Sequence, residues 1–274
     1  MSHDFTAFMV VTRNDDAEYF RVALLSLLNQ SMKPSEILII DNGGLTEQHY
    51  EIIDSVSDEF NLNLMRIENL SSIGYARNIA LNAATYPIIA VADPDDVNEF
   101  DRFINIINEL NDRVRMVGSW MREFSYEVHD RKIIRKVPCA YVDIIRYAKL
   151  RSPVNNPTIC YFKKDALEVG GYNTSLSFGE DYDLVMKFIR KKKIIFNLQC
   201  ITVNFRAGDK KRLYQKRSGL FLLTQEIKLH WQFFKRRDIS LLYFFMIITL
   251  KMFFRLLPRR VFDFFYIKVL RKNE

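Results

Sequence analysis

The sequence predicts an α/β fold with a mainly parallel central sheet flanked by helices, followed by a C-terminal helical extension. Apolar runs alternate with helical patterns through the first 110 residues, which is typical of repeated β-α-β units. The length of 274 residues suits one large α/β domain with an appendage. Beyond residue 211 the pattern is almost wholly helical. We therefore expect an α/β domain over residues 1–211 and a basic, aromatic-rich helical region over 212–274.

The expected elements follow one another at short spacing. Strands are expected at 5–12, 36–41, 62–67 and 88–92, with helices at 17–29, 46–59, 73–84 and 100–110. A less regular stretch follows, with strands near 116–124 and 158–162, a helix after Asp181, and short strands at 194–196 and 202–205. The helical tail is broken at Pro258.

Composition excludes several classes of protein. The 49% hydrophobic content excludes disorder, and Cys139, Cys160 and Cys200 form no C-x-x-C pair, which indicates reduced cysteines in a cytosolic protein without a zinc site. The longest uncharged stretch of the tail, 239–250, is twelve residues, well short of the ~20 that span a bilayer. The first basic residue is Arg13, so we expect neither a signal peptide nor a transmembrane helix.

The net charge of +7 is unevenly distributed. Residues 1–185 carry 18 Lys and Arg against 28 Asp and Glu, a balance of −10, whereas 186–274 carry 22 against 5, a balance of +17. This asymmetry indicates different partners for the two parts of the chain.

Polar side chains follow each of the first four strands. In open parallel sheets, ligands bind at the carboxyl ends of the strands. Here those ends carry Thr12 to Asp15, Asp41 to Gly44, Asn69, and Asp93 to Asp96. We expect these groups to share one edge of the sheet.

Asp93, Asp95 and Asp96 form an acidic cluster directly after an apolar strand. Carboxylates two residues apart in a loop can converge on Mg²⁺ or Mn²⁺, which takes one or two protein carboxylates plus phosphate oxygens. That chemistry suits a diphosphate ligand. The alternative is that these aspartates cap the helix that begins near Phe100.

Five ordered segments resemble the family 2 glycosyltransferases, which have the nucleotide-sugar-binding GT-A fold. They are Thr-Arg-Asn at 12–14, Leu-Ser-Leu-Leu-Asn-Gln-Ser at 25–31 before Glu-Ile-Leu-Ile-Ile-Asp-Asn-Gly at 36–43, Gly-Tyr-Ala-Arg-Asn at 74–78, the D-x-D, and Gly-Gly-Tyr at 170–172 before Gly-Glu-Asp-Tyr-Asp-Leu at 179–184. The resemblance covers about residues 5–210 and includes bacterial cell-surface and capsular polysaccharide enzymes.

The resemblance implies a nucleotide pocket. Asp41 resembles the aspartate that accepts a hydrogen bond from the base, usually uracil, and Thr12 and Asn14 would line the same pocket. An Asx turn with Gly43 and Gly44 is the alternative interpretation of Asp41.

The next positions would contact the rest of the donor. Asn69 and Arg77 fall where the family contacts the nucleotide, and Arg77 could meet a phosphate or steady Asp41. Otherwise Arg77 is an exposed helix residue. Asp93 resembles the residue near the ribose and diphosphate, and Asp95 resembles the principal ligand of Mn²⁺ or Mg²⁺.

Glu180 and Asp181 open a helix, whose partly positive N-terminus keeps a carboxylate ionised. The resemblance implies that Asp181 is the general base of an inverting transfer and that Glu180 orients acceptor or sugar hydroxyls. The alternative is that Asp181 caps the helix.

The chain departs from the family pattern in two places. Asn156 stands where relatives often have the His of Asn-His-Pro-Thr, at the border of the acceptor site. Many relatives have a His after the base helix as a further metal ligand, and here the segment from Phe205 to Gly208 has none nearby. Arg206, with Lys210, Lys211 and Arg212, could pair with the diphosphate as a mobile loop, or this could be a solvated basic loop.

The tail carries twelve aromatic residues interspersed with Lys and Arg. They are Trp231, Phe233, Phe234, Tyr243, Phe244, Phe245, Phe253, Phe254, Phe262, Phe264, Phe265 and Tyr266. This pattern favours peripheral contact with an anionic membrane on the cytoplasmic side. The alternative is a helical subdomain that packs on the core or forms a homo-oligomer.

Together these features predict an inverting, metal-dependent transfer from a UDP-sugar to a hydroxyl of a glycan or lipid-linked acceptor in bacterial surface polysaccharide synthesis. Two alternatives were weighed: a nucleotidyltransferase acting on sugar phosphates, and a basic nucleic-acid-binding protein. The turn after the first strand has neither Gly nor Lys, which disfavours the first. The acidic front half disfavours the second, so we expect no nucleic-acid partner.

Overall fold

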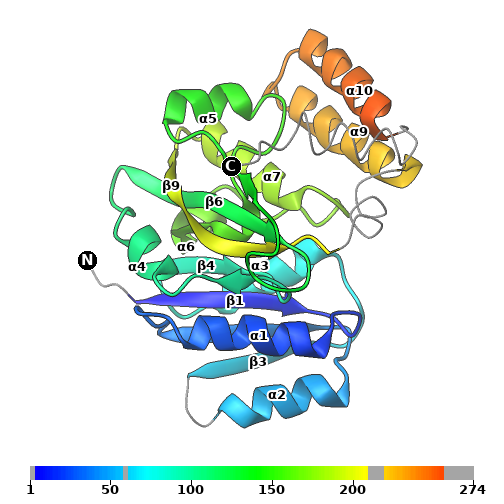
Figure 1. The fold of residues 1–274 in the computed structure, drawn as a ribbon. Helices are drawn as coiled ribbons and strands as arrows, with labels where there is room; N and C mark the ends of the chain where they lie inside the picture. Colours follow the sequence, from blue (N-terminus) through cyan, green and yellow to red (C-terminus); the bar gives the residue numbers. More distant parts are fainter. Residues whose placement is uncertain (1–3, 58–60, 209–218, 256–274) are drawn as a thin grey trace.

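The computed structural model describes residues 4–57, 61–208 and 219–255, and it has one sheet between two layers of helices, with a helical hairpin at one end (Figure 1). The strand order is β3-β2-β1-β4-β8-β6-β9-β5, and β7 pairs with β6. The strands are β1 (Phe5–Val11), β2 (Glu36–Asn42), β3 (Leu62–Ile67), β4 (Ile88–Ala92), β5 (Val97–Asn98), β6 (Val114–Phe124), β7 (Ile133–Arg135), β8 (Cys160–Phe162) and β9 (Ile194–Arg206).

The helices of the first 110 residues, the helix at 180–190 and the helices of the tail lie where the sequence places them, whereas those at 141–147 and 163–168 were not expected. The helices are α1 (Ala17–Leu28), α2 (Glu47–Ser57), α3 (Ile73–Ala83), α4 (Arg102–Ile107), α5 (Tyr141–Tyr147), α6 (Lys163–Glu168), α7 (Glu180–Arg190), α9 (Leu220–Lys235) and α10 (Leu241–Arg255). The helix expected at 100–110 is shortened to α4, because Asn111 folds back to cap the turn before β6 with bonds to the amides of residues 113 and 114.

The first half of the sheet confirms the predicted parallel arrangement. Strands β3, β2, β1 and β4 pair in parallel, and the register sets Val11 beside Asp41. Beyond β4 the sheet becomes mixed: β8 is antiparallel to both β4 and β6, while β9 runs parallel to β6. The carboxyl ends of β1, β2 and β4 therefore meet at one edge.

The two short strands expected at 194–196 and 202–205 are one strand, β9, of 13 residues. The polar residues around Gln199 break the apolar alternation, and the structure absorbs them as irregularities in the register with β6 between Ser119 and Met121. The strand expected at 158–162 begins at Cys160, because a single 3₁₀ turn at Asn156–Thr158 precedes it.

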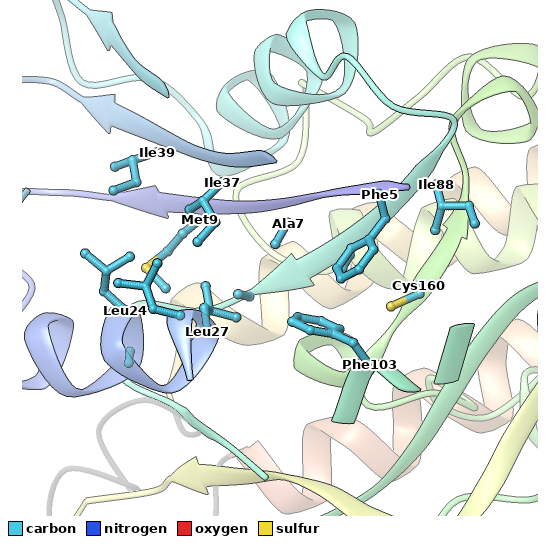
Figure 2. Packing of buried hydrophobic residues seen from close by; sticks show 14 of the residues in the cluster. Phe5, Ala7, Met9, Leu24, Leu27, Ile37, Ile39, Ile88, Phe103 and Cys160 are labelled. Atoms are coloured by element: carbon cyan, nitrogen blue, oxygen red, sulfur yellow. The ribbon is translucent and has the colours of Figure 1, made fainter. Parts of the chain in front are cut away.

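The core lies on both faces of the sheet, and β1 shows how. Phe5, Ala7 and Met9 point to the face covered by α1 and α4, where Phe103 stacks at 4.8 Å from Phe5 (Figure 2). Phe8 and Val10 point to the other face, under α3 and α7. This period of two buries the strand completely. The core thus fixes where each strand ends and its loop begins.

The hairpin of α9 and α10 packs on α7. Tyr182 and Met186 of α7 join Leu229, Phe233 and Ile247 of the hairpin in a separate hydrophobic cluster. The inner face of the hairpin therefore packs on the rest of the protein. The sequence had left this packing as an alternative to membrane contact. Pro258 and the residues after 255 lie outside the described part.

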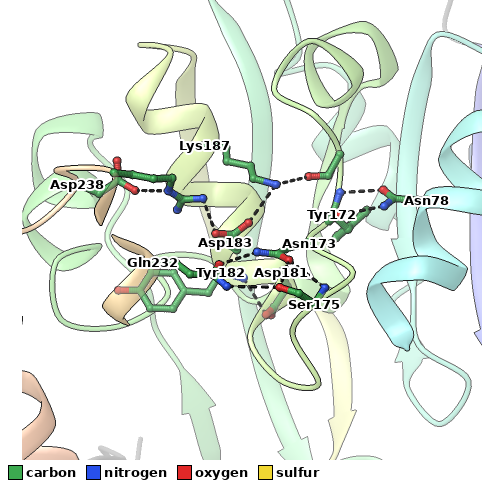
Figure 3. Close-up of polar contacts among 12 residues, drawn as sticks. Asn78, Tyr172, Asn173, Ser175, Asp181, Tyr182, Asp183, Lys187, Gln232 and Asp238 are labelled. Atoms are coloured by element: carbon green, nitrogen blue, oxygen red, sulfur yellow. Dashed lines mark hydrogen bonds and ion pairs between the residues drawn. The ribbon is translucent and has the colours of Figure 1, made fainter. Parts of the chain in front are cut away.

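Ion pairs reinforce this docking (Figure 3). The buried carboxylate of Asp183 lies 2.7 Å from Arg236 of the hairpin and 3.0 Å from Lys187. Asn173 donates to Gln232 at 2.6 Å. Among the helices that the structure describes, none combines the length and apolar character needed to span a bilayer.

We expect the docking of the hairpin to weaken in acid. Burial, with the neighbouring Lys251, lowers the pKa of His230 from 6.5 to about 4, so the unfolded state binds this proton more readily. Burial alone would raise the pKa of Glu226, but Arg255 and Lys251 outweigh it and lower the pKa to about 2. The stability that neutral His230 contributes is thus complete above pH 6.5 and is lost as the pH falls to about 4. The stability that ionised Glu226 contributes is lost as the pH falls from its ordinary pKa of 4.5 to about 2.

Fluorescence of Trp231 in a Trp120→Phe background follows the packing of the hairpin, since the chain has two tryptophans and Trp231 of α9 contacts the ring of Phe244 of α10 edge to face. A His230→Phe variant should lose the part of the change that falls between pH 6.5 and 4. A Trp231 signal that stays constant down to pH 4 would contradict the prediction.

Candidate active site

Three residues expected near the base lie at the ends of β1 and β2. Thr12 closes the turn before α1, because its backbone N and its hydroxyl both donate to Asp15, at 2.7 and 2.9 Å. Asn14 is exposed in the same turn. Since Val11 pairs with Asp41, the two turns are neighbours. The sheet therefore brings Thr12, Asn14 and Asp41 together as predicted.

Asp41 is fully buried and its carboxylate already has partners. It accepts hydrogen bonds from the Gly44 amide at 2.8 Å and from the Tyr50 hydroxyl at 2.6 Å, and Arg66 lies 3.6 Å away. The bond to Gly44 is the turn that the sequence offered as an alternative. A nucleotide base could bond to the Oδ2 atom of this carboxylate only if Tyr50 or Arg66 moved away from it.

Asn69 is exposed in the loop between β3 and α3. This loop is tied to the end of β2, because Asn42 accepts from the Ser71 amide at 2.9 Å and donates to the Ser71 carbonyl at 3.1 Å. Asn69 thus lies on the same edge of the sheet as Asp41.

Arg77 links the two acidic constellations. Its side chain is buried in α3 and donates to Glu180 at 2.5 Å and to Asp93 at 3.4 Å. It does not contact Asp41, and it is not an exposed helix residue, so both of those expectations are wrong. The reason is position: Arg77 follows Ala76 on the face of α3 that packs toward α7. Its two carboxylate neighbours raise the pKa of the guanidinium against the effect of burial.

Glu180 and Asp181 form the first turn of α7, after Gly179. Burial raises the pKa of Glu180 to about 7, and Asp181 adds to the shift, while Arg77 opposes it. Gly179, not Asp181, occupies the cap position, with φ of 80°. The positive φ favours glycine at this turn, and a Cβ here would also lie 2.7 Å from the end of the Leu229 side chain of α9, which would then have to shift.

The loop after β4 turns its third aspartate inward. Asp96 is buried and accepts from the Arg206 amide at 2.8 Å. Burial, with Asp95 and Asp93 nearby, raises the pKa of Asp96 well above its ordinary value. Asp93 and Asp95 remain partly exposed. Two aspartates of the loop are thus partly exposed, and the third holds the shape of the loop.

Arg206 is the last residue of β9 and is buried, so its placement in a mobile or solvated loop is wrong. Its guanidinium donates to the Asp95 carbonyl at 3.0 Å and lies 3.8 Å above the Tyr19 ring. Arg206 thus stabilises the loop that follows β4 through its contacts with Asp95 and Asp96. Lys210, Lys211 and Arg212 lie outside the described residues.

The oxygen donors of Asp93 and Asp95 fit a hard divalent cation. Among the described residues there is no group of three or more His, Cys, Asp or Glu side chains around one point. Mg²⁺ is commonly held by one or two carboxylates together with substrate phosphates. The two partly exposed carboxylates of Asp93 and Asp95 are therefore enough protein ligands for such an ion. The donor set is therefore compatible with the expected Mn²⁺ or Mg²⁺.

A cavity of about 550 Å³ opens beside these groups. Its walls include Asp93, Asp181 and Asn156, which come from three separate parts of the chain. The Oδ1 atom of Asn156 is buried and has no hydrogen-bond partner among the described residues. The cavity thus brings the predicted base and the predicted acceptor contact together.

The family comparison agrees with this site. The model described as "Glycosyl transferase family 2" matches residues 7–171, more than half of the chain. The chain belongs to glycosyltransferase family 2. It is therefore a glycosyltransferase.

Two curated relatives match nearly the whole chain. A UDP-Gal:alpha-D-GlcNAc-diphosphoundecaprenol beta-1,3-galactosyltransferase of Escherichia coli is 31% identical over 98% of this chain and 97% of its own. The amylovoran biosynthesis glycosyltransferase AmsE of Erwinia amylovora is 22% identical over 96% of this chain and 98% of its own.

A solved structure shows the same fold. The Staphylococcus aureus TarS in complex with UDP-GlcNAc superposes with a TM-score of 0.66 at 17% identity, over 97% of this chain and 76% of that chain. The chain spans 46% of a longer TarS structure. This likeness confirms the GT-A fold.

Sequence reasoning missed the residues that the hairpin contributes to the cavity, among them Glu226, Lys251 and Arg255. Glu226 had a readable signal, because it lies with Leu223, Leu229 and Phe233 on the buried face of α9. A carboxylate on an apolar face requires a buried partner.

Arg77→Met should destabilise the fold and abolish transfer, because it leaves Glu180 buried without its cation. Breaking a buried ion pair costs about 3–5 kcal/mol. The double variant Arg77→Met, Glu180→Gln should recover part of the lost stability but not activity, because Asp93 still lacks its cation. Urea unfolding and UDP release measure the two effects. Arg66→Gln, an exposed arginine beside Asp41, is the matched control and should change stability by less than about 1 kcal/mol. Equal stability of Arg77→Met and wild type would contradict the assignment.

Proposed function

We propose that the protein transfers a sugar from a UDP-sugar to a hydroxyl of a lipid-linked or glycan acceptor, with inversion at the anomeric carbon, in bacterial surface polysaccharide synthesis. The observation that carries this proposal is the single cavity that Asp93 of the D-x-D loop shares with Asp181 of α7. A diphosphate leaving group and an acceptor hydroxyl would then meet where one carboxylate can take a proton.

The donor would lie along the ends of β1 to β4. Thr12, Asn14 and Asn69 are proposed to border the nucleotide, with Asp41 reading the base once Tyr50 or Arg66 moves. Asp95 and Asp93 would hold Mn²⁺ or Mg²⁺, which when bound supplies positive charge to the departing diphosphate. Arg206 is proposed to support this loop rather than to contact the diphosphate.

Asp181 would act as the base. The acceptor oxygen forms its bond to the anomeric carbon, the bond from that carbon to the diphosphate oxygen breaks, and the hydroxyl proton passes to the Asp181 carboxylate. Attack from the face opposite the leaving group inverts the configuration. Asn156 would orient the acceptor through its unpartnered Oδ1.

Glu180 contributes differently, because its carboxylate is bonded to Arg77. That pair would fix the first turn of α7 and so aim Asp181 into the cavity. Glu180 is therefore proposed chiefly as a positioning residue, and its proposed contact with sugar hydroxyls is secondary.

The names of the relatives support one class of acceptor. The Escherichia coli relative is named for a GlcNAc-diphosphoundecaprenol acceptor, so a sugar carried on a lipid diphosphate is the first candidate here. Such an acceptor lies in a membrane, so the enzyme must work at its surface. We place the protein in the cytoplasm, peripheral on the inner face of the cell membrane.

The outer face of the hairpin supports this placement. Large apolar side chains are exposed there, at fractions from 46% to 78%. They are Leu220, Phe221, Leu241, Leu242, Phe245, Met246, Leu250, Met252 and Phe253. Bulky apolar residues flanked by Lys and Arg favour the interface of an anionic membrane. A homo-oligomer formed through the same face is the competing use.

Asp181→Asn should lower kcat by about 10²- to 10⁴-fold while the UDP-sugar still binds, because the amide cannot accept the proton. UDP release from a panel of UDP-sugars, led by UDP-galactose with a GlcNAc-diphosphate-lipid acceptor, measures the rate with and without Mn²⁺. Asp95→Ala should instead weaken donor binding and its dependence on metal. Asp143→Asn serves as the control, because Asp143 is an exposed residue of α5 whose ion pair is with the exposed Arg146. Retained transfer by Asp181→Asn would refute its role.

Flotation on vesicles tests the membrane face. The double variant Leu242→Glu, Phe245→Glu should lose most binding to vesicles that contain phosphatidylglycerol, because it charges the exposed face of α10. Phe100→Glu, another exposed phenylalanine far from the hairpin in sequence, should bind as wild type does. A changed oligomeric state in light scattering, with unchanged flotation, would favour the homo-oligomer instead.

A further inference from the structure

The hairpin forms one wall of the cavity that contains Asp181. Lys251 and Arg255 of α10 line it, together with Glu226 of α9. Arg151, which follows α5, lines the same cavity. Basic residues from two separate segments therefore meet on the hairpin side of the acceptor cavity, outside the positions that the family motifs mark.

Contacts within this cluster are unequal. The Glu226 carboxylate accepts from Lys251 at 2.7 Å and from two nitrogens of Arg255 at 2.8 and 3.0 Å. Arg151 is exposed, and its guanidinium lies 5.4 Å from the centre of the Tyr147 ring. These four side chains carry three positive charges and one negative charge.

Packing alone does not require this excess of positive charge. One cation opposite Glu226 would satisfy the buried carboxylate and tie α9 to α10. Burial lowers the pKa of Lys251, and Arg255 and Arg151 lower it further, while Glu226 opposes them. The cations are thus close enough to disfavour one another, and a bound anion would relieve that repulsion.

Apolar side chains border the same side of the cavity. Leu150 and Leu250 both line it and are 42% and 52% exposed. Leu250 directly precedes Lys251 and belongs to the exposed apolar face of α10 described above. A ligand in this place would find cations inside the cavity and an apolar surface at its edge.

We propose that Arg151, Lys251 and Arg255 form an anion subsite of the acceptor cavity, which takes the diphosphate that joins the acceptor sugar to its lipid. The inference rests on the proposed function and deepens it. The sugar hydroxyl would face Asp181, the diphosphate would lie against the three cations, and the lipid chain would leave over Leu250 toward the membrane. The hairpin is then part of the acceptor site as well as a surface anchor.

Binding of a short alkyl diphosphate, measured by calorimetry, tests the subsite without any turnover. Arg151→Gln and Lys251→Gln should each weaken this binding by about tenfold, since charge-assisted hydrogen bonds are lost. Arg146→Gln is the matched control, because Arg146 is an exposed arginine on α5 that does not line the cavity. No binding by the wild-type protein, or equal binding by Arg151→Gln, overturns the inference.

Kinetics separate this subsite from a general loss of activity. With a GlcNAc-diphosphate-alkyl acceptor, Arg151→Gln should raise KM about tenfold and leave kcat nearly unchanged. With the matching GlcNAc alkyl glycoside, which lacks phosphate, the variant and the wild type should be equal. An equal loss on both acceptors overturns the subsite, whereas absence of transfer by wild type, with intact alkyl diphosphate binding, overturns only the proposed function.

Two further measurements identify the source of the anion. If phospholipid headgroups occupied the subsite, Arg151→Gln would reduce flotation on phosphatidylglycerol vesicles. If the donor diphosphate occupied it, saturating UDP with Mn²⁺ would displace the alkyl diphosphate. Either result overturns the proposal, and the expected result is unchanged flotation with no displacement by UDP.

Discussion

The buried guanidinium of Arg77 is the interaction on which the site depends, because it holds two carboxylates from distant parts of the chain. Glu180 begins α7 and Asp93 directly follows β4, and the cation between them offsets the repulsion of the buried Glu180 carboxylate and the partly exposed Asp93 carboxylate. Through Tyr182 and Met186, α7 in turn packs against the hairpin. The loop after β4, α7 and the hairpin are thus linked through one arginine.

The front of the molecule was predictable because local and global signals agree there. Each of the first four strands carries a mostly apolar run, helices follow at short spacing, and parallel pairing then brings Asp41 and Asp93 to one edge. Gln199 and its neighbours hid the continuity of β9, since a bulged register leaves no periodic pattern to follow. The bounds of regular strands are therefore easier to predict from one sequence than those of irregular strands.

Roles that depend on long-range contacts were less predictable. Arg206 looked like part of a basic loop, yet pairing of β9 with β6 and β5 buries it under the D-x-D loop. Arg77 looked like a partner for Asp41, but Arg66 lies there instead. In both cases the sequence indicated that the arginine has a polar partner, but it did not identify that partner. A guanidinium can reach several carboxylates about equally well.

The contact of Gly179 with Leu229 gives the hairpin a second consequence. Gly179 turns the chain into α7, and a Cβ at this position would lie 2.7 Å from the end of the Leu229 side chain of α9. A shift of α9 against α7 would therefore change the packing around the turn that precedes Asp181. The position of the hairpin and the position of Asp181 are thus coupled through packing.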